Sequence, residues 1–169
     1  MSARFIRPAL VGFALALGAL SLAPAQVFAI GAESVEQPAA AKSKWDEKFG
    51  ELGDGYKKAV ELAEAGKYAE AIDALKALNK PEDPRVLNYL GYSTRKMGKP
   101  EDALVFYDKA IAIEPDFAPA REYRGEAYIQ LGKIDKAKAE LVEIERICGN
   151  KTCESYVDLA AALAAAPKS

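Results

Sequence analysis

The two cysteines are the residues of this 169-residue chain whose type and spacing most directly indicate chemistry. Cys148 and Cys153 are separated by GNKT, and a pair so close in sequence forms a disulfide in an oxidising compartment. Closing such a short loop contributes about 2 kcal/mol of stability. A redox-active pair is the alternative, although the spacing differs from Cys-x-x-Cys and no neighbouring residue type favours a thiolate. We predict a structural disulfide.

The remaining polar residues give little support to enzyme chemistry. The chain contains no histidine, which removes the commonest general base and the commonest ligand of transition metals. Two thiolates alone do not complete a tetrahedral zinc site. Carboxylate pairs such as Glu61/Glu64 and Glu143/Glu145 fall in segments typical of solvated helix surfaces. We expect no catalytic residue, no metal site and no cofactor.

Charge and composition restrict the class of partner. The chain has 23 basic and 25 acidic side chains, a formal net charge of −2. It therefore lacks the basic excess with which nucleic-acid binders neutralise phosphates, and we expect no nucleic-acid partner. Hydrophobic residues make up 50% of the chain, which is enough to bury the core of one compact domain.

Residues 1–29 have the three-part layout of a secretory signal peptide. Arg4 and Arg7 precede an uncharged apolar run at residues 9–22. This run is shorter than the roughly 20 residues that a helix needs to cross a bilayer. We predict cleavage after Ala29; cleavage after Ala25 and retention as an anchor are the alternatives. The mature protein is then periplasmic or secreted and meets the membrane only during export, or permanently if the segment is retained.

A linker and a short helix follow. Residues 30–44 lack any hydrophobic period and are rich in Ala, Glu, Ser, Pro and Lys, as expected of a flexible linker. Trp45, Phe49 and Leu52 then stand at i, i+4 and i+7, which predicts a helical face with Ser43 as its cap. Trp45 either covers the open apolar end of the domain that follows or contacts a ligand; the covering role is the simpler one.

An internal repeat is the strongest signal in the sequence. The pattern Gly-Lys-x-x-x-Ala occurs as GKYAEA, GKPEDA and GKIDKA, starting at residues 66, 98 and 132. Each copy lies between two stretches with helical hydrophobic spacing, so each predicts a helix, a tight turn and a second helix. The hairpins cover about 52–83, 84–117 and 118–151. Residues 152–166, with Thr152 as the helix cap, are expected to close the array.

These hairpins resemble the tetratricopeptide repeat family. The middle copy matches best, with family-typical residues at Leu87, Leu90, Gly91, Ala103, Tyr107, Ala110 and Pro115. The resemblance implies an all-α, right-handed α-solenoid of about three helical hairpins with a C-terminal capping helix, over residues 45–166. Gly91 and Ala103 are expected to face each other where the two helices of one hairpin approach. Arg121 and Arg124 replace apolar family residues; they either pair with acids such as Glu122 or Asp108, or bind an anion.

The resemblance also implies a concave groove lined by the first helix of each hairpin. By family position, the partner-binding residues are Tyr56, Arg85, Asn88, Tyr89, Tyr92, Arg95, Lys96, Glu122, Tyr123 and Glu126. Tyrosine and arginine are typical of binding hot spots. The hypothesis is a ligand segment with aromatic or proline residues, whose acidic end meets the basic cluster Arg85, Arg95 and Lys96. The alternative is that these are solvated charges and tyrosines packed between helices.

The function that follows is a non-catalytic protein-interaction module or adaptor of the bacterial cell envelope, which binds a peptide or partner segment. The alternative is an accessory or small-molecule-binding subunit of a periplasmic enzyme system. The residues with which family members hold the carboxylate tail of cytosolic chaperones are missing here. Their places carry Tyr56, Val60, Tyr89, Pro119 and Tyr123.

Overall fold

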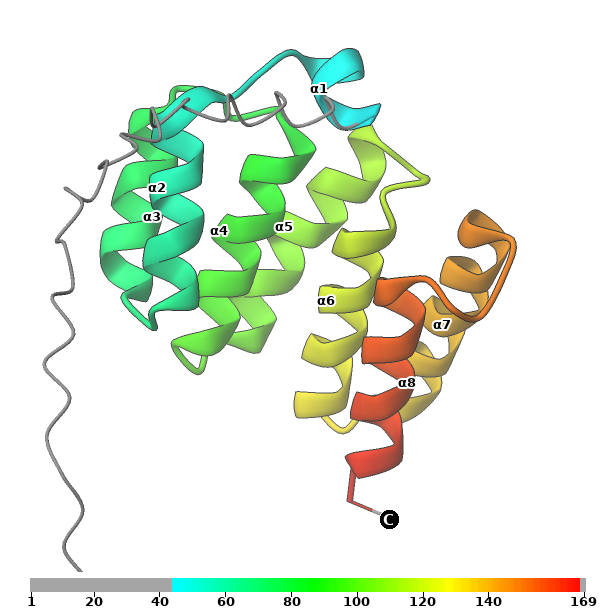
Figure 1. Cartoon of the computed structure of the whole chain (residues 1–169). Helices are drawn as coiled ribbons and strands as arrows, with labels where there is room; N and C mark the ends of the chain where they lie inside the picture. Colours follow the sequence, from blue (N-terminus) through cyan, green and yellow to red (C-terminus); the bar gives the residue numbers. More distant parts are fainter. Residues whose placement is uncertain (1–43, 168–169) are drawn as a thin grey trace, which may run out of the picture. The chain divides into compact units, whose positions relative to one another are not determined.

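The computed structural model of the chain describes residues 44–167, and this part is all-helical (Figure 1). The predicted signal peptide at 1–29 and almost all of the linker at 30–44 lie outside these residues. The helices are α1 (Lys44–Phe49), α2 (Gly53–Glu64), α3 (Tyr68–Ala77), α4 (Pro84–Lys96), α5 (Pro100–Ile113), α6 (Ala118–Gln130), α7 (Ile134–Cys148) and α8 (Glu154–Ala165). Among the described residues, no helix combines the length and the apolar character that a membrane span requires.

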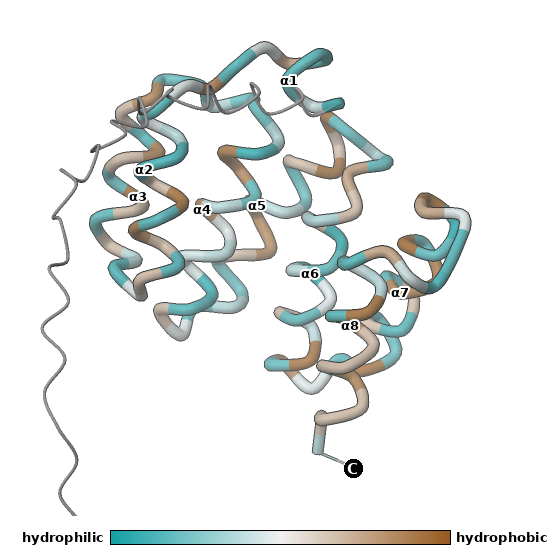
Figure 2. The backbone as a smooth tube through the Cα atoms, viewed as in Figure 1, coloured by the Kyte–Doolittle hydropathy of each residue, from teal (hydrophilic) through white to brown (hydrophobic). Residues whose placement is uncertain are grey.

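Three antiparallel hairpins, α2/α3, α4/α5 and α6/α7, pack one on the next, and α8 lies against α6 and α7. The predicted all-α solenoid with a C-terminal capping helix is confirmed. Figure 2 shows hydrophobic and hydrophilic stretches alternating along the helices of the stack. This is the pattern of amphipathic helices that bury one face against their neighbours.

The repeated Gly-Lys motif forms the same turn three times. Its glycines have φ angles of +77°, +80° and +69° (Gly66, Gly98 and Gly132), a left-handed conformation that residues with a Cβ rarely adopt. In each turn the lysine N–H donates to the carbonyl oxygen five residues earlier, over 2.9, 3.3 and 2.8 Å. This hydrogen bond is the mark of a Schellman helix end. The sequence repeat is therefore a repeat of backbone geometry.

The two helices of the middle hairpin meet around Tyr107, which is fully buried. A Cβ built on Gly91 would lie 2.5 Å from Cε1 of Tyr107, so this position has no room for a side chain. The atoms nearest to this position thus belong to Tyr107, with which Ala103, one turn earlier on α5, also packs; a direct contact of Gly91 with Ala103 stays a prediction. Gly125 of α6 makes the corresponding space for Leu159 of α8.

The C-terminal helix is tied to the array by the predicted disulfide, which is confirmed between Cys148 and Cys153. The bridge joins the last residue of α7 to the residue that precedes α8. The expected cap, Thr152, is wrong, because Cys153 occupies the N-cap position. Instead, Oδ1 of Asn150 accepts the backbone N–H groups of Thr152 and Cys153, at 2.9 and 3.1 Å.

The sequence predicted that Trp45 of the short helix α1 covers the open apolar end of the domain. In the structure, α1 does not cover the first hairpin. The Trp45 ring meets the Phe117 ring edge-on at 4.8 Å and packs on a cluster that includes Leu87 and Ile111. These residues belong to the second hairpin and to the start of the third. The Trp45 side chain therefore packs on the second hairpin and the start of the third, and not on the first hairpin, which the covering role would require.

Candidate binding groove

A cavity of about 680 Å³ opens among the first helices of the three hairpins, α2, α4 and α6, and the capping helix α8. We call this cavity the groove. Its lining comes from the N-terminal halves of these helices, from α1, and from the segments before α2 and α6. The lining residues are Trp45, Asp46, Glu51, Leu52, Gly53, Tyr56, Lys57, Arg85, Asn88, Tyr89, Phe117, Pro119, Glu122, Tyr123, Glu154, Ser155 and Asp158.

Six of the predicted site residues line the groove, namely Tyr56, Arg85, Asn88, Tyr89, Glu122 and Tyr123. Tyr92, Arg95, Lys96 and Glu126 lie further along α4 and α6 and are not part of the lining. The contributions of α1 and α8 to the lining were not predicted from the sequence. The acids of α8, Glu154 and Asp158, stand at i and i+4; treating α8 as the first helix of a fourth hairpin would have found them.

The groove tyrosines and their neighbour Tyr92 form a series of ring contacts across the helices. Ring centroids are 5.8 Å apart for Tyr56 and Tyr89, 5.9 Å for Tyr89 and Tyr92, and 5.1 Å for Tyr92 and Tyr123. Burial raises the pKa of Tyr89 to about 12 and that of Tyr56 and Tyr123 further above its ordinary value. The rings therefore stay neutral near pH 7 and present both aromatic surface and hydroxyl groups.

Arg85 serves to hold α1, which the sequence did not predict. It is 6% exposed and donates to both carboxylate oxygens of Asp83, at 3.0 and 2.6 Å. It also donates to Asp46 at 2.5 Å and to the carbonyl oxygen of Gly50 at 2.7 Å. The hydrogen bond with Asp83 is the largest influence that raises the pKa of Arg85. Its positive charge is therefore compensated within the chain.

Arg95 is likewise paired inside the solenoid. It is 3% exposed, forms an ion pair with Glu126, and places its guanidinium 5.8 and 5.7 Å from the ring centroids of Tyr92 and Tyr123. Lys96 lies 5.4 Å from the Tyr92 ring. Two of the three residues of the basic cluster that was to receive an acidic ligand end, Arg85 and Arg95, therefore already pair with carboxylates of the chain.

Negative charge dominates one side of the groove. Glu122 of α6 lies beside Glu154 and Asp158 of α8, and we call these three residues the acidic wall. Within residues 44–167, none of the three forms an ion pair with a lysine or arginine. Burial raises the pKa of Glu122 to about 7, and the nearby carboxylates add to this, whereas a hydrogen bond with Ser155 lowers it.

Among the six predicted residues that line the groove, Asn88 alone has a buried polar atom without a hydrogen-bond partner. It is 3% exposed, lines the groove, and its Oδ1 has no hydrogen-bond partner among the described residues. Leaving a buried amide oxygen without a partner costs free energy. This side chain therefore brings an unsatisfied acceptor to the lining of the groove.

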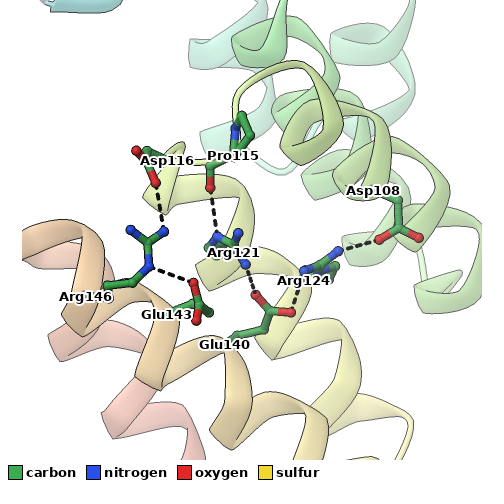
Figure 3. A network of polar contacts seen from close by, with 8 residues as sticks. All are labelled: Asp108, Pro115, Asp116, Arg121, Arg124, Glu140, Glu143 and Arg146. Atoms are coloured by element: carbon green, nitrogen blue, oxygen red, sulfur yellow. Dashed lines mark hydrogen bonds and ion pairs between the residues drawn. The ribbon is translucent and has the colours of Figure 1, made fainter.

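The two unusual arginines of the third hairpin have structural partners (Figure 3). Arg124 donates to Asp108 and to Glu140, both at 2.6 Å. Arg121 donates to Glu140 at 3.3 Å and to the carbonyl oxygen of Pro115 at 3.1 Å. The paired interpretation is confirmed for Asp108, but Glu122 is not a partner, because it faces the groove. These bonds join α5, α6 and α7.

Comparison with known proteins supports the repeat interpretation. Residues 95–147 match the tetratricopeptide repeat family. Protein FlbA of Caulobacter vibrioides is 34% identical over 84 residues, which are 48% of this chain and 14% of FlbA. The chain therefore spans only a small part of the length of this relative.

Two solved structures share the arrangement of helices. The type III secretion translocator chaperone SycD of Yersinia enterocolitica aligns with a TM-score of 0.61 and 23% identity, over 68% of this chain and 89% of SycD. PcrH, solved in complex with the chaperone binding region of PopB, aligns with a TM-score of 0.56 and 23% identity, over 69% of this chain and 94% of PcrH. The described helices therefore form a solenoid of tetratricopeptide-type hairpins, and residues 95–147 carry the sequence signature of the tetratricopeptide repeat family.

Proposed function

We propose that this protein is a non-catalytic interaction module or adaptor of the bacterial cell envelope, and that its groove binds a peptide or partner segment. The observation that carries the proposal is the groove itself, a hollow of about 680 Å³ with tyrosines from three successive hairpins on its surface. Tyrosine supplies a large contact area at a low cost in side-chain entropy. PcrH, which shares the fold, was solved with a segment of another protein.

The envelope location rests on two features of the chain. Residues 1–29 have the layout of an export signal, and Cys148 and Cys153 form a disulfide, a bond that persists in oxidising compartments such as the periplasm. Fractionation of cells that produce the full-length chain tests this location. Recovery of a shortened form from the periplasm is expected, and exclusive recovery from the cytoplasm at full length would contradict it.

Site-specific photo-crosslinking in intact cells tests the binding surface. A photoreactive amino acid is introduced in place of Lys57, an exposed groove residue, or Val142, which is 64% exposed on α7. Because α7 contributes nothing to the groove lining, Val142 is the matched control. We expect a partner to crosslink from Lys57 and not from Val142. Crosslinks of the same partner from Val142 alone would place binding on the second helices and contradict the proposal.

A second candidate is a small-molecule-binding subunit of a periplasmic enzyme system. The groove volume supports it, because pockets for small ligands range from about 300 to 1,000 Å³. An anionic ligand is disfavoured, since Arg85 and Arg95 pair with carboxylates of the chain. A thermal-shift screen of small organic anions and cations separates the candidates. A large stabilisation by a free compound, without any crosslinked protein partner, would favour the second candidate.

A further inference from the structure

The solenoid already contains one arginine bound by tyrosines and a carboxylate. The Arg95 guanidinium lies beside the neighbouring rings of Tyr92 and Tyr123, over both of them, and forms an ion pair with Glu126. Attraction to two aromatic faces and to a carboxylate offsets the cost of burying this charge. The arrangement shows which side chains hold a guanidinium on this surface.

One helical turn earlier on α4 and α6, a tyrosine ring and a carboxylate recur, but no arginine of residues 44–167 lies between them. Tyr89 stands three residues before Tyr92 on α4, Glu122 stands four residues before Glu126 on α6, and Tyr123 lies between the two levels. Tyr89, Glu122 and Tyr123 all line the groove. The second level therefore has two rings and a buried carboxylate, with an open space beside them.

The charge around this second level is negative. Glu154 and Asp158 of α8 complete the acidic wall beside Glu122. The basic residues of the lining are Lys57 and Arg85. Lys57 lies on α2, 3.3 Å from Asp54, and Arg85 pairs with Asp83 and Asp46. Neither compensates the acidic wall, so a cation from outside would meet an attractive field.

The unpartnered Asn88 is an independent observation that points to a ligand at the same place. It projects from α4, one residue before Tyr89, and lines the same groove with its amide oxygen unsatisfied. An amide group can donate to a peptide carbonyl and accept from a peptide N–H. A bound segment of backbone would therefore satisfy what the folded chain leaves open.

We propose that the acidic wall, Tyr89, Tyr123 and Asn88 form a subsite for one arginine side chain of a bound partner segment. This rests on the proposed function. The ligand guanidinium lies one helical turn before the Arg95 guanidinium. Glu122 is its main carboxylate, and the rings of Tyr89 and Tyr123 lie beside it. The amide of Asn88 bonds to the backbone of the same segment. The resulting preference is opposite to that of family members that hold a carboxylate tail.

Titration of the isotope-labelled full-length chain with blocked tripeptides, followed by NMR, tests the subsite. The probes are acetyl-Ala-Arg-Ala-amide and its citrulline and glutamate counterparts. Citrulline keeps the shape of arginine and lacks its charge. We expect the arginine peptide to bind about tenfold more tightly than the citrulline peptide, with shifts at Asn88, Tyr89 and Ser155, and the glutamate peptide not to bind.

Two variants assign the preference to these residues. Glu122→Gln should reduce the affinity for the arginine peptide to that for the citrulline peptide. Glu101→Gln, an exposed acid on α5, is the matched control and should change nothing. Asn88→Leu should weaken binding of both peptides while thermal stability stays equal or rises, because an unsatisfied buried amide is replaced by an apolar side chain of similar size. If either Glu122→Gln or Asn88→Leu binds the arginine peptide as tightly as the wild-type chain, the replaced residue does not belong to the subsite.

The outcomes separate this inference from the proposed function. Equal binding of the arginine and citrulline peptides, or a preference for the glutamate peptide, would overturn the arginine subsite and leave the groove as a binding surface. Absence of binding by all three peptides at millimolar concentration would also overturn the subsite. The groove proposal is decided independently by crosslinking from Lys57 and Val142.

Discussion

At the scale of single residues, Glu122 links the groove to pH. Its ordinary pKa is 4.5, and in the folded chain burial and its acidic neighbours raise it to about 7. Below pH 4.5 the carboxyl is protonated in both states and contributes no difference. Between pH 4.5 and 7 the unfolded chain loses this proton more readily, so stability falls as pH rises, by roughly 3 kcal/mol in full.

Replacing this carboxyl should therefore flatten the dependence of stability on pH. We expect Glu122→Gln to unfold at a higher temperature than the wild-type chain at pH 8, and the difference to shrink at pH 4.5. Thermal unfolding followed by circular dichroism at the two pH values measures this. Glu101→Gln is again the control, with no such change. A difference for Glu122→Gln that is the same at both pH values would show that Glu122 does not titrate as described.

Residue types alone could predict part of the groove. Tyr56, Tyr89 and Tyr123 were placed on it because their position depends only on hairpin register. The roles of Arg85 and Arg95 were missed because their partners depend on packing between distant segments. Asp46 lies 39 residues from Arg85 in sequence, and no local pattern connects them. The unmet bond of Asn88 is visible only when every neighbouring donor and acceptor has a position.

At the scale of elements, α1 is a short helix held almost entirely by its side chains. With six residues, it has too few backbone hydrogen bonds to be stable alone. Arg85 bonds to Asp46 and to the carbonyl oxygen of Gly50 at the end of α1, and Trp45 packs on Phe117. The short segment therefore depends on Arg85, on the ion pair of Lys48 with Glu114 and on one aromatic contact for its position beside the groove.

Loss of the Asp46 carboxylate should release α1. Trp45 is the sole tryptophan of the chain, so its fluorescence reports this contact directly. We expect Asp46→Ala to shift the emission maximum to longer wavelength, with nearly unchanged helix content by circular dichroism. Asp54→Ala removes an exposed acid of α2 and is the control. An unshifted spectrum in Asp46→Ala would mean that the remaining contacts, Trp45 with Phe117 and Lys48 with Glu114, are enough to position the helix.

Elements set by local chemistry were easier to predict than elements set by docking. The three Gly-Lys turns follow from a positive φ at each glycine, which is a property of one residue. The place of α1 was predicted wrongly because Trp45 could satisfy the same hydrophobic face at several surfaces of the stack. Thr152 was expected to cap α8, but Cys153 occupies the N-cap position, and Asn150 in the loop closed by the disulfide accepts the N–H groups of Thr152 and Cys153.

At the scale of the whole array over residues 44–167, each hairpin contacts its neighbours in sequence order. Stability in such stacks is close to a sum of unit and interface terms, so a weakened end loosens locally. The disulfide acts at one such end, where it ties α8 to α7.

Removal of the bridge should therefore loosen the C-terminal end selectively. We expect the double variant Cys148→Ser/Cys153→Ser to lose about 2 kcal/mol, with faster amide hydrogen exchange in α8 and little change in α2 and α3. Hydrogen exchange with mass spectrometry measures this by segment. Equal acceleration in all helices would indicate one cooperative unit, and no acceleration in α8 would show that Leu159 and its neighbours hold the helix unaided.

The capping helix also supplies Glu154 and Asp158 to the groove, directly after the bridged Cys153. The helix that shields the apolar end of the stack is therefore also a wall of the proposed binding groove. A thiol-containing buffer, routine in purification, would reduce the disulfide and loosen α8 while leaving most of the fold in place. A search for partners under reducing conditions would therefore use a protein in which α8 is displaced from the groove. The oxidised chain is the form to use in a search for a binding partner.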